Sequence, residues 1–379
     1  MELSEIRKKI DETDEKLLPL FLERMNLSAE AVRYKAEHSM PILNKSRESE
    51  ILERVMRESG DMEQYAHRLY MMIFELSRAY QATLSHKNSK ITEEIKKAIA
   101  DSETSLPQRA AVACQGVEGA YSEEAATKMF PRGNLMFFKS FEAVFEAVES
   151  GLCRYGTVPV ENSSNGPVKE IYDLLRIKNV KIVKSDRLCI RHELIGLPGT
   201  KPEEIKEIRS HRQALGQCSE YLKKLGADVT IVPYPNTAMA AKSVADGKDK
   251  SVAAIASHSV CEIYGLETVE ENIQNSDNNY TRFICISQKA EIYPGANRIS
   301  FVVECENRPG ALYSIIAKLA ALGIDILKLE NYPIVGRNFD YVFFFDIAAS
   351  VKDVKTLAML ESIEYECKKL IFLGNYSEG

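Results

Sequence analysis

Residues 3–37 read LSEIRKKIDETDEKLLPLFLERMNLSAEAVRYKAE, and this stretch decides the fold of the first part of the chain. Its apolar residues recur at the spacing of one helix face. These residues are Leu3, Ile6, Ile10, Leu17, Phe21, Ala29 and Val32. The pattern predicts a single helix that is about 50 Å long at 1.5 Å per residue, with Pro19 as a kink. A helix of that length needs a partner chain to cover its apolar stripe.

Glycine content predicts where the helical region ends. The first 100 residues contain Gly60 as their one glycine of 19, and two of the 13 prolines. A region so poor in turn formers is expected to be helical. We expect Pro41 to end the first helix, and two further helices over about 45–58 and 62–85. Residues 87–108 are polar and charged, a connector with one short helix. The sequence thus predicts an all-α domain over 1–90 and a linker over 91–108.

The rest of the chain changes style twice. Runs such as AAVACQG, RYGTVPVEN and VKIVKSD alternate with amphipathic stretches, which predicts an α/β domain over residues 109–290. From about residue 297, RISFVVECEN, RPGALYSIIAKLAALG, IDILKLENYPIV and DYVFFFDIAA precede a closing helix and strand. The order β-α-β-β-α-β predicts an α+β, ferredoxin-like domain over 297–379.

Composition excludes several classes of protein. Hydrophobic residues make up 45% of the chain and charged residues 27%, with a net charge of −6, so we expect globular domains and no nucleic-acid partner. No stretch approaches 18 apolar residues, and the charged N-terminus is no signal peptide. We therefore expect a cytoplasmic protein without a membrane partner. The eight cysteines form no CxxC pair and have no histidine at zinc spacing, which favours buried reduced thiols and no metal or cofactor.

Several polar residues of the helical region fall on shared faces. Arg24 and Lys35 are 11 positions apart, which is about 1100° and thus close to three full turns. Ser77 and Gln81 share a face of the third helix at i, i+4. Three more residues complete the set: Arg7, Arg47 and Glu48. Several cations with one carboxylate and one amide suit a small dianion that carries a hydroxyl group.

Residues 1 to about 88 resemble the all-helical chorismate mutases. The resemblance lies in the first helix and in the stretches LNKSRESEILERV and ELSRAYQ. The resemblance implies a chorismate site in which carboxylates are bound by Arg24, Arg47 and, from a second subunit, Arg7. In this implied site, Lys35 and Gln81 bind the ether oxygen, and Glu48 holds the ring hydroxyl. Ser77 and Asn44 line the implied pocket. Asn44 stands where an aspartate is common. A Claisen rearrangement needs no nucleophile, so the site must hold a compact conformer and stabilise charge on the ether oxygen. Lys35 and Gln81 are thus the expected catalytic residues.

Four clusters mark the middle region: GVEGAYSEEAA (116–126), VPVENSSNGPV (158–168), RSHRQALGQC (209–218) and NNYTRF (278–283). Taken alone, the second cluster is typical of a surface loop, and the fourth cluster is typical of an ordinary strand. In this order the four resemble prephenate dehydratase over about 111–287. Such domains resemble two-lobed periplasmic binding proteins, which implies lobes near 109–187 and 188–265, with the chain returning to the first lobe.

The same resemblance implies the roles of the dehydratase residues. Thr281 is the essential catalytic hydroxyl, and it acts on the departing hydroxide by hydrogen bonding because a threonine is a feeble acid. Arg282 is either a substrate anchor or a structural partner. His211 is either a general acid or a residue that orients its neighbours. The other implied prephenate contacts are Ser122, Glu161, Asn162, Ser163, Ser210 and Gln217.

The C-terminal region resembles the ACT type of amino-acid-binding regulatory domain over residues 297–379. Pro309 and Gly310 make a tight turn before a helix whose free N–H groups suit a carboxylate. The resemblance implies L-phenylalanine as effector, bound between two subunits. The implied effector contacts are Asn307, Pro309, Gly310, Ala311, Leu312 and Glu330. Residues 330–333 read ENYP where Glu-Ser-Arg-Pro is usual, so the strength of binding stays open.

Taken together, the three resemblances predict a bifunctional enzyme of phenylalanine biosynthesis with feedback control, acting as a homodimer or tetramer. Two alternatives remain open. One is a mutase fused to prephenate dehydrogenase, although GVEGAYS lacks the GxGxxG fingerprint of a dinucleotide site. The other is a non-catalytic amino-acid sensor.

Overall fold

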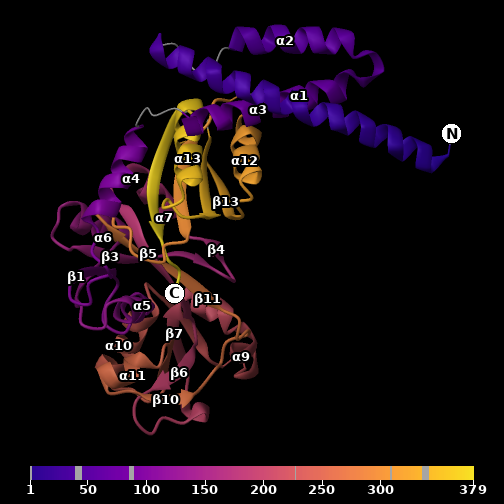
Figure 1. The fold of residues 1–379 in the computed structure, drawn as a ribbon. Coiled ribbons are helices and arrows are strands. Elements are labelled where there is room, and N and C mark those ends of the chain that lie inside the picture. The colour runs from indigo at the N-terminus through magenta and orange to yellow at the C-terminus, as the bar shows by residue number, and fades with distance from the viewer. Residues whose placement is uncertain (1, 39–44, 85–88, 227, 308–309, 335–340) are drawn as a thin grey trace. The chain divides into compact units, whose positions relative to one another are not determined.

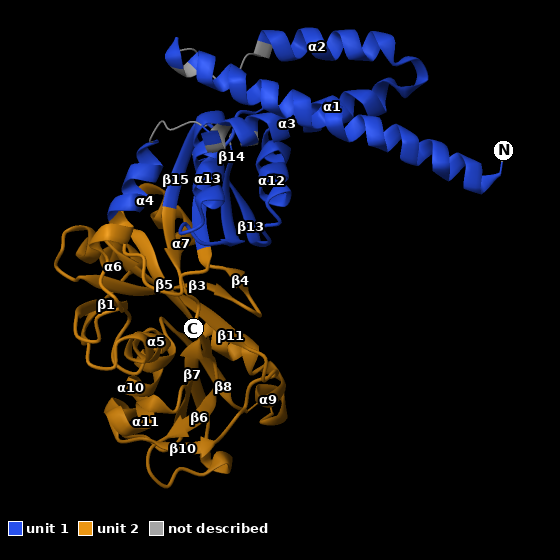
Figure 2. Ribbon diagram, viewed as in Figure 1, with its two compact units in different colours: residues 1–97, 299–372 blue, residues 98–298, 373–379 orange. Residues whose placement is uncertain are grey.

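The computed structural model describes residues 2–38, 45–84, 89–226, 228–307, 310–334 and 341–379. Its elements form two compact units, which Figure 2 colours separately. The first unit holds residues 1–97 and 299–372, and the second holds residues 98–298 and 373–379. Three residues of the sequence-based predictions, Pro41, Asn44 and Pro309, lie outside the described residues. No helix in the described ranges is long and apolar enough to cross a membrane.

The helices of the first unit follow the predicted pattern (Figure 1). They are α1 (Leu3–Glu37), α2 (Lys45–Glu58), the 3₁₀ turn η1 (Gly60–Met62), α3 (Glu63–Leu84) and α4 (Lys90–Asp101). The three long helices and the short helix of the connector are therefore confirmed, with Pro19 inside α1. Gly60 has a φ of 52°, a left-handed conformation that glycine adopts at little cost, and it makes the turn between α2 and α3.

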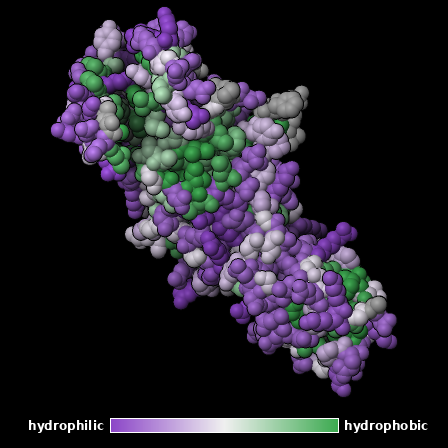
Figure 3. All heavy atoms as spheres, turned by 90° about the vertical axis from the view of Figure 1, so that its right-hand side faces the viewer, coloured by the Kyte–Doolittle hydropathy of each residue, from purple (hydrophilic) through white to green (hydrophobic). Residues whose placement is uncertain are grey.

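Helix α1 exposes most of its apolar side chains. Of its described side chains, only Ala29 and Val32 are buried, and both lie near its C-terminal end. Ile10 and Leu17, on the predicted stripe, are 53% and 56% exposed. Helix α3 adds exposed apolar side chains at helical spacing, namely Tyr65, Leu69 and Met72. Figure 3 shows apolar surface gathered over the upper part of the molecule, where Figure 2 draws the first unit.

The C-terminal segment has the predicted β-α-β-β-α-β order. Its elements are β12 (Arg298–Glu304), α12 (Ala311–Ala321), β13 (Ile326–Pro333), β14 (Tyr341–Ala348), α13 (Val354–Glu366) and β15 (Lys369–Tyr376). The strands form a four-stranded sheet in the order β13-β14-β12-β15. Both α12 and α13 contact α3. Residues 1–97 and 299–372 therefore form one compact unit, whereas the sequence predicts separate domains over 1–90 and 297–379.

The second unit contains two sheets. The first has the order β2-β1-β3-β11-β5, with β4 beside β3. Its strands are β1 (Ala111–Gln115), β2 (Asn134–Phe138), β3 (Tyr155–Asn162), β4 (Gly166–Pro167), β5 (Lys181–Cys189) and β11 (Tyr280–Ser287). Strand β11 lies between β3 and β5 and runs antiparallel to both. The helices of this lobe are α5 (Tyr121–Met129), α6 (Phe141–Glu149) and α7 (Lys169–Ile177).

The second sheet of this unit has the order β10-β6-β9-β7-β8. Its strands are β6 (Glu193–Gly196), β7 (Glu207–His211), β8 (Thr230–Tyr234), β9 (Val252–Ala256) and β10 (Glu267–Glu270). The helices are η2 (Pro202–Glu204), α8 (Arg212–Gln217), α9 (Ser219–Lys224), α10 (Thr237–Gly247) and α11 (Ser259–Tyr264). The chain enters this lobe after β5 and returns to the first sheet with β11, which confirms the predicted two lobes.

The two chain crossings between the lobes run side by side. Ile190 N donates to Asn279 O at 2.7 Å, and Ile273 N donates to His192 O at 3.0 Å. The crossings therefore bring residues 190–192 next to the segment that leads into β11. Each lobe has its own apolar core, since Val112 and Phe283 belong to one buried cluster and Ala240 and Ala254 to another.

The cysteines are free thiols. Cys114, Cys153, Cys218 and Cys285 are buried and the other four are half-buried. Burial raises the pKa of the Cys114 thiol to about 12, so it stays protonated and unreactive near neutral pH. Among the described residues, no three side chains of the His, Cys, Asp and Glu types are grouped as a metal site.

Candidate active sites

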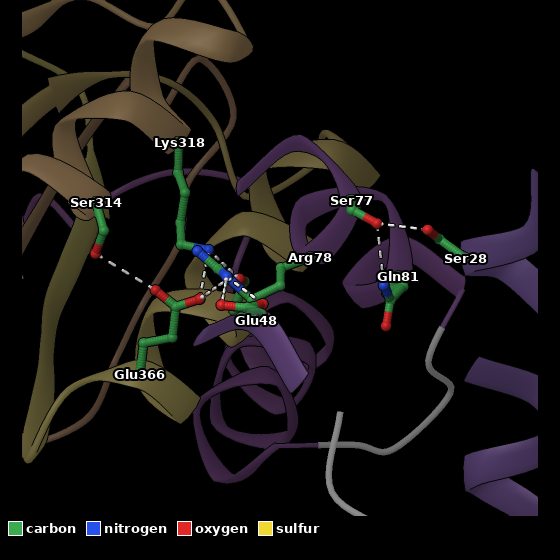
Figure 4. Close-up of polar contacts among 9 residues, drawn as sticks. Ser28, Glu48, Ser77, Arg78, Gln81, Ser314, Lys318 and Glu366 are labelled. Atoms are coloured by element: carbon green, nitrogen blue, oxygen red, sulfur yellow. Dashed lines mark hydrogen bonds and ion pairs between the residues drawn. The ribbon is translucent and has the colours of Figure 1, made fainter. Parts of the chain in front are cut away.

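A chain of hydrogen bonds joins α3 to α1 in the helical segment. Gln81 Nε2 donates to Ser77 Oγ at 3.2 Å, and Ser77 Oγ donates to Ser28 Oγ at 2.6 Å (Figure 4). Ser28 Oγ in turn donates to Arg24 O at 3.0 Å. The predicted i, i+4 pair of Ser77 and Gln81 is thus brought together and buried, at 5% and 8% exposure. Because Nε2 carries two hydrogens and this bond uses one, the other can be donated to a bound acceptor.

Arg24 lies on α1 beside the same residues. Its guanidinium stacks over the ring of Phe74 at 5.3 Å, and its Nη1 atom is buried without a hydrogen bond among the described residues. Burial lowers the pKa of Arg24 from its ordinary value, but a guanidinium keeps its charge at neutral pH. A buried cationic nitrogen that lacks a partner is suited to receive a carboxylate from a bound anion.

Glu48 and Arg47 open α2 but have different surroundings. Both oxygens of Glu48 contact Arg78 Nη1, at 2.6 and 2.8 Å. Arg47 is exposed and donates to Glu50 Oε2 at 2.9 Å on the outer surface of α2. The structure therefore brings Glu48 to α3 and leaves Arg47 on the surface of the single chain.

The remaining mutase residues of the prediction are spread along α1. Lys35 is half-buried in the last turn of α1, while Arg7 is exposed near its start. Four turns of helix and more separate Arg7 from Arg24, so Arg7 does not join Arg24 within one chain. This distance agrees with the prediction that Arg7 serves a site on a second subunit, which the single chain does not test.

In the second unit, strand pairing places Thr281 against Asn162. Thr281 pairs with Asn162 and Arg282 pairs with Glu161 at the ends of β11 and β3. The register shifts directly after Arg282, which is the mark of a β-bulge. A bulge changes the direction of neighbouring side chains and is common beside active sites.

Asn162 is the centre of a buried hydrogen-bond network. Its Nδ2 donates to Thr281 Oγ1 at 2.9 Å, to Asn279 Oδ1 at 2.8 Å and to the carbonyl of Tyr280 at 3.2 Å. Its Oδ1 accepts from the backbone N–H groups of Ser164 and Asn165, each at 3.0 Å. Thr281 and Asn162 are only 9% and 8% exposed. The hydroxyl of Thr281 thus accepts a bond from Asn162 and donates none to the described residues.

Arg282 and Ser163 form contacts within the protein. The side chain of Arg282 is 4% exposed, and its Nε lies 2.6 Å from Glu161 Oε1. Of the two predicted roles, this burial and ion pair favour a structural partner. Ser163 Oγ donates to Asn278 O at 3.1 Å and accepts from Tyr280 N at 2.9 Å, so this hydroxyl joins the ends of β3 and β11.

A second polar group includes Gln217, at the end of α8. Its Oε1 lies 2.8 Å from Nε2 of His192, whose Nδ1 lies 3.0 Å from the hydroxyl of Tyr121. His192 is 2% exposed, and burial lowers its pKa, so the ring is neutral. Because Gln217 Oε1 only accepts, Nε2 of His192 carries the proton. The Gln217 amide is thereby oriented with its Nε2 free of described partners.

The other predicted dehydratase residues have separate surroundings. Ser210 is fully buried and donates to Ile255 O at 2.6 Å, a bond between β7 and β9. Ser122 is buried at 7% exposure on α5. His211 caps α8, where its Nδ1 accepts from Gln213 N at 3.4 Å, and burial lowers its pKa. Of the two predicted roles of His211, this geometry favours that of orienting its neighbours.

Two family models match the chain. The prephenate dehydratase model matches residues 112–291, and the chorismate mutase type II model matches residues 6–82. A bifunctional chorismate mutase/prephenate dehydratase from Stutzerimonas stutzeri is 31% identical over 388 residues, which cover 100% of this chain and 98% of that protein. The chain belongs to the bifunctional chorismate mutase/prephenate dehydratase family.

Further relatives cover the dehydratase half. Arogenate dehydratase/prephenate dehydratase 2, chloroplastic, from Arabidopsis thaliana is 37% identical over 280 residues, covering 71% of this chain and 73% of that protein. The structure of prephenate dehydratase from Arthrobacter aurescens in complex with L-Phe has a TM-score of 0.65 at 25% identity, covering 70% of this chain and 89% of that one. A structure of GqqA, described as a quorum quenching acylase, has a TM-score of 0.65 at 27% identity. The match covers 71% of this chain and 98% of that one.

This mutase/dehydratase therefore has two activities, isomerisation of chorismate to prephenate and conversion of prephenate to phenylpyruvate in phenylalanine biosynthesis. The prediction of a bifunctional enzyme is confirmed. A dehydrogenase in place of the dehydratase, and a sensor without catalysis, are both ruled out by the two matching models.

In the C-terminal segment of the mutase/dehydratase, Gly310 caps α12 with a φ of 83°, a left-handed value. Among the described residues other than its chain neighbours, no atom lies within 4 Å of where a Cβ at Gly310 would stand. Ala311 is buried, Leu312 is half-buried and Asn307 is exposed. Glu330 is half-buried on β13, opposite Phe344 of β14 and 3.9 Å from Lys328.

Sequence reasoning missed residues that support the expected ones. In the helical segment, Ser28 contacts Ser77 and Arg78 contacts Glu48. In the second unit, Asn279 contacts Asn162 and His192 contacts Gln217. Asn279 lies inside the NNYTRF cluster, so its position was a usable signal. Arg78 likewise lies inside the ELSRAYQ stretch, whereas His192 carried no such signal, because its partners are distant in sequence.

Proposed function

We propose that one chain carries the two reactions at two separate sites, with the following roles in the mutase. The free N–H of Gln81 Nε2 and the ammonium of Lys35 donate to the ether oxygen of chorismate. The Nη1 atom of Arg24, which has no hydrogen-bond partner among the described residues, binds a carboxylate. Glu48 accepts a hydrogen bond from the ring hydroxyl. The hydrogen-bond chain from Gln81 to Arg24 supports this proposal, because it orients the amide before substrate arrives.

In the dehydratase, we propose that Thr281 assists the departure of the ring hydroxyl of prephenate. Breaking the carboxylate C–C bond releases CO2, and its electron pair completes the aromatic ring as the C–O bond of the ring hydroxyl breaks. The departing hydroxide leaves as water with one proton supplied by the buffered solvent, so the reaction consumes one proton overall. Thr281 donates a hydrogen bond to that oxygen, where negative charge develops. The observation that carries this role is the position of the Thr281 hydroxyl, which accepts a hydrogen bond from Asn162 and donates none to the described residues.

The other prephenate contacts divide by chemistry. Gln217 Nε2 is a donor free of described partners, which suits a substrate carboxylate. The hydroxyl of Ser122, close to the N-terminus of α5, suits the same role. We assign Ser163, Ser210 and the Arg282–Glu161 pair to holding the strand ends in place.

We propose a homodimer built on α1. The exposed apolar stripe of α1 is unusual for a monomer, and a second copy of the same helix would bury it. In such a dimer, Arg7 of one chain reaches the pocket formed by Arg24 and Gln81 of the other. Any tetramer would be assembled from this dimer.

We propose that the C-terminal segment is the ACT domain and binds L-phenylalanine at the loop before α12. The first N–H groups of α12 have no acceptors within the helix, as at any helix N-terminus, and they suit an amino-acid carboxylate. Control by L-phenylalanine follows the chemistry of the pathway, because this amino acid is the transaminated product of phenylpyruvate.

Incubation of the purified chain with chorismate alone tests the two reactions. Appearance of prephenate followed by phenylpyruvate supports the proposal. Accumulation of prephenate would contradict the dehydratase roles.

Calorimetric titration tests the effector. We expect L-phenylalanine to bind and to reduce both activities. Absence of heat at millimolar L-phenylalanine would refute the effector site and leave both catalytic assignments standing.

A further inference from the structure

Arg78 lies between two carboxylates that belong to different segments of the first unit (Figure 4). It follows Ser77 on α3, and its Nη1 contacts both oxygens of Glu48 on α2 at 2.6 and 2.8 Å. Its Nε lies 3.3 Å from Oε1 of Glu366, at the end of α13. The side chain of Arg78 is 14% exposed, so both ion pairs are partly shielded from water and stronger than surface pairs.

Glu366 is held in turn by α12. Lys318 Nζ, on a side chain that is 2% exposed, lies 2.9 Å from Glu366 Oε1 and donates to Ser362 Oγ at 2.7 Å. Ser314 Oγ, one turn earlier on α12, lies 3.5 Å from Glu366 Oε2. Charges of alternating sign therefore run without a gap from α2 through α3 and α13 to α12.

The far end of this row of charges lies on α12, the helix that follows the proposed effector loop. Helix α12 starts at Ala311, directly after Gly310. Ala311, Ser314 and Glu366 line one small hollow. A ligand that moves the first turn of α12 thus acts on residues that contact Glu366.

We propose that Arg78 is a positioning residue for the mutase, which holds the carboxylate of Glu48 for the ring hydroxyl and links it to the C-terminal segment through Glu366. This inference rests on the role of Glu48 given above. Each carboxylate oxygen has two lone pairs, so Arg78 occupies one on each and leaves the others for substrate. Movement of Glu366 changes how the guanidinium is shared between the two carboxylates, and so the position of Glu48.

The first test is kinetic and needs no effector. We expect Arg78→Gln to lower mutase kcat/KM at least about tenfold, mostly through KM, because Glu48 contacts substrate before the reaction. Dehydratase activity should stay within about twofold and report that the chain is folded. Arg78→Lys should restore only part of the loss, since an ammonium lacks the planar fork. Arg68→Gln, at an exposed arginine of the same helix, is the matched control.

A double variant separates positioning from a structural role. If Arg78 acts through Glu48, Glu48→Gln with Arg78→Gln should be no worse than Glu48→Gln alone. Losses that simply add, or an Arg78→Gln variant that matches Arg68→Gln, would overturn the positioning role.

The second test addresses the link to α12. In Glu366→Gln, we expect the response of mutase activity to L-phenylalanine, measured as the ratio of its rates without and with the effector, to fall at least about fivefold. Calorimetry should show unchanged L-phenylalanine binding, and the dehydratase response should persist. An unchanged mutase response in Glu366→Gln, or a wild-type mutase that does not respond to bound L-phenylalanine, would overturn the link. If the wild type binds no L-phenylalanine, the effector proposal and the link fail together, whereas the first test still decides the role of Arg78.

Discussion

The side-chain amide of Asn162 donates to the hydroxyl oxygen of Thr281 at 2.9 Å, from the end of β3 to the start of β11. Strand register sets this contact, because the two residues are direct partners in the antiparallel pair. A hydroxyl that accepts a hydrogen bond becomes a stronger donor through its own hydrogen. The pair therefore supplies a donor whose position and strength are both set before substrate binds.

Removing the hydroxyl of Thr281 should stop the dehydratase. We expect Thr281→Ala to lower kcat for phenylpyruvate formation by about 100-fold or more, the usual cost of one donor to a developing oxyanion. Thr281→Ser should keep most of the activity. Prephenate formation from chorismate should be unaffected, and an equal loss of both activities would contradict separate sites.

Removing the amide of Asn162 should reduce dehydratase activity indirectly. Asn162→Ala leaves the turn N–H groups of Ser164 and Asn165 without their acceptor and frees the side chain of Thr281. We expect kcat to fall by about 100-fold, as for a catalytic group misplaced by about 1 Å. Unfolding in urea should show a loss of about 1–3 kcal/mol. Ser164→Ala, at an exposed side chain in the same turn, is the control and should retain activity.

Stability should depend on pH through His192. Burial holds the pKa of His192 below its ordinary value of 6.5, so the unfolded chain binds more protons than the folded chain at mildly acidic pH. Its contribution is therefore complete above about pH 6.5 and is lost as the pH falls toward the folded pKa. We expect the melting temperature of His192→Gln to fall less between about pH 7.5 and 5.5 than that of the wild type.

His258 offers a control of opposite sign. A hydrogen bond to Glu193 raises the pKa of His258, so its contribution is present at low pH and is lost as the pH rises. The melting temperature of His258→Gln should thus fall more between about pH 7.5 and 5.5 than that of the wild type, whereas that of His192→Gln should fall less. The same direction of change in both variants would contradict the assignment for His192.

Charge on the stripe of α1 should break the proposed dimer. Ile10 is 53% exposed in the single chain, and we expect Ile10→Glu to weaken association at least about tenfold, as measured by sedimentation. Mutase activity should fall with association, because Arg7 of the partner leaves the site, while dehydratase activity should not depend on α1. Lys8→Glu, on the opposite face of α1, is the matched control. A wild-type chain that sediments as a monomer would refute the dimer.

Local pattern was sufficient for most of the fold. Apolar spacing predicted α1 over residues 3–37, and scarcity of glycine predicted the helices that follow, because helix formation depends mainly on near neighbours. The alternation of β-rich and amphipathic runs predicted an α/β unit for the same reason, whereas its two lobes were implied by the resemblance to prephenate dehydratase. Site residues such as Thr281 and Gln81 were predicted from the resemblance of their motifs to those of known enzyme families.

Tertiary structure decided which of those residues meet. Thr281 and Asn162 are more than 100 positions apart, and only the pairing of β11 with β3 brings them into contact. The contact of Arg78 with Glu366 depends on the packing of α3 against α13, which joined two segments expected to be separate domains. Arg47, predicted from its motif to bind substrate, pairs with Glu50 on the surface of the single chain. The sequence determined the helices, strands and motifs through local spacing, whereas hydrogen-bond and ion-pair partners were decided by packing between residues far apart in the chain.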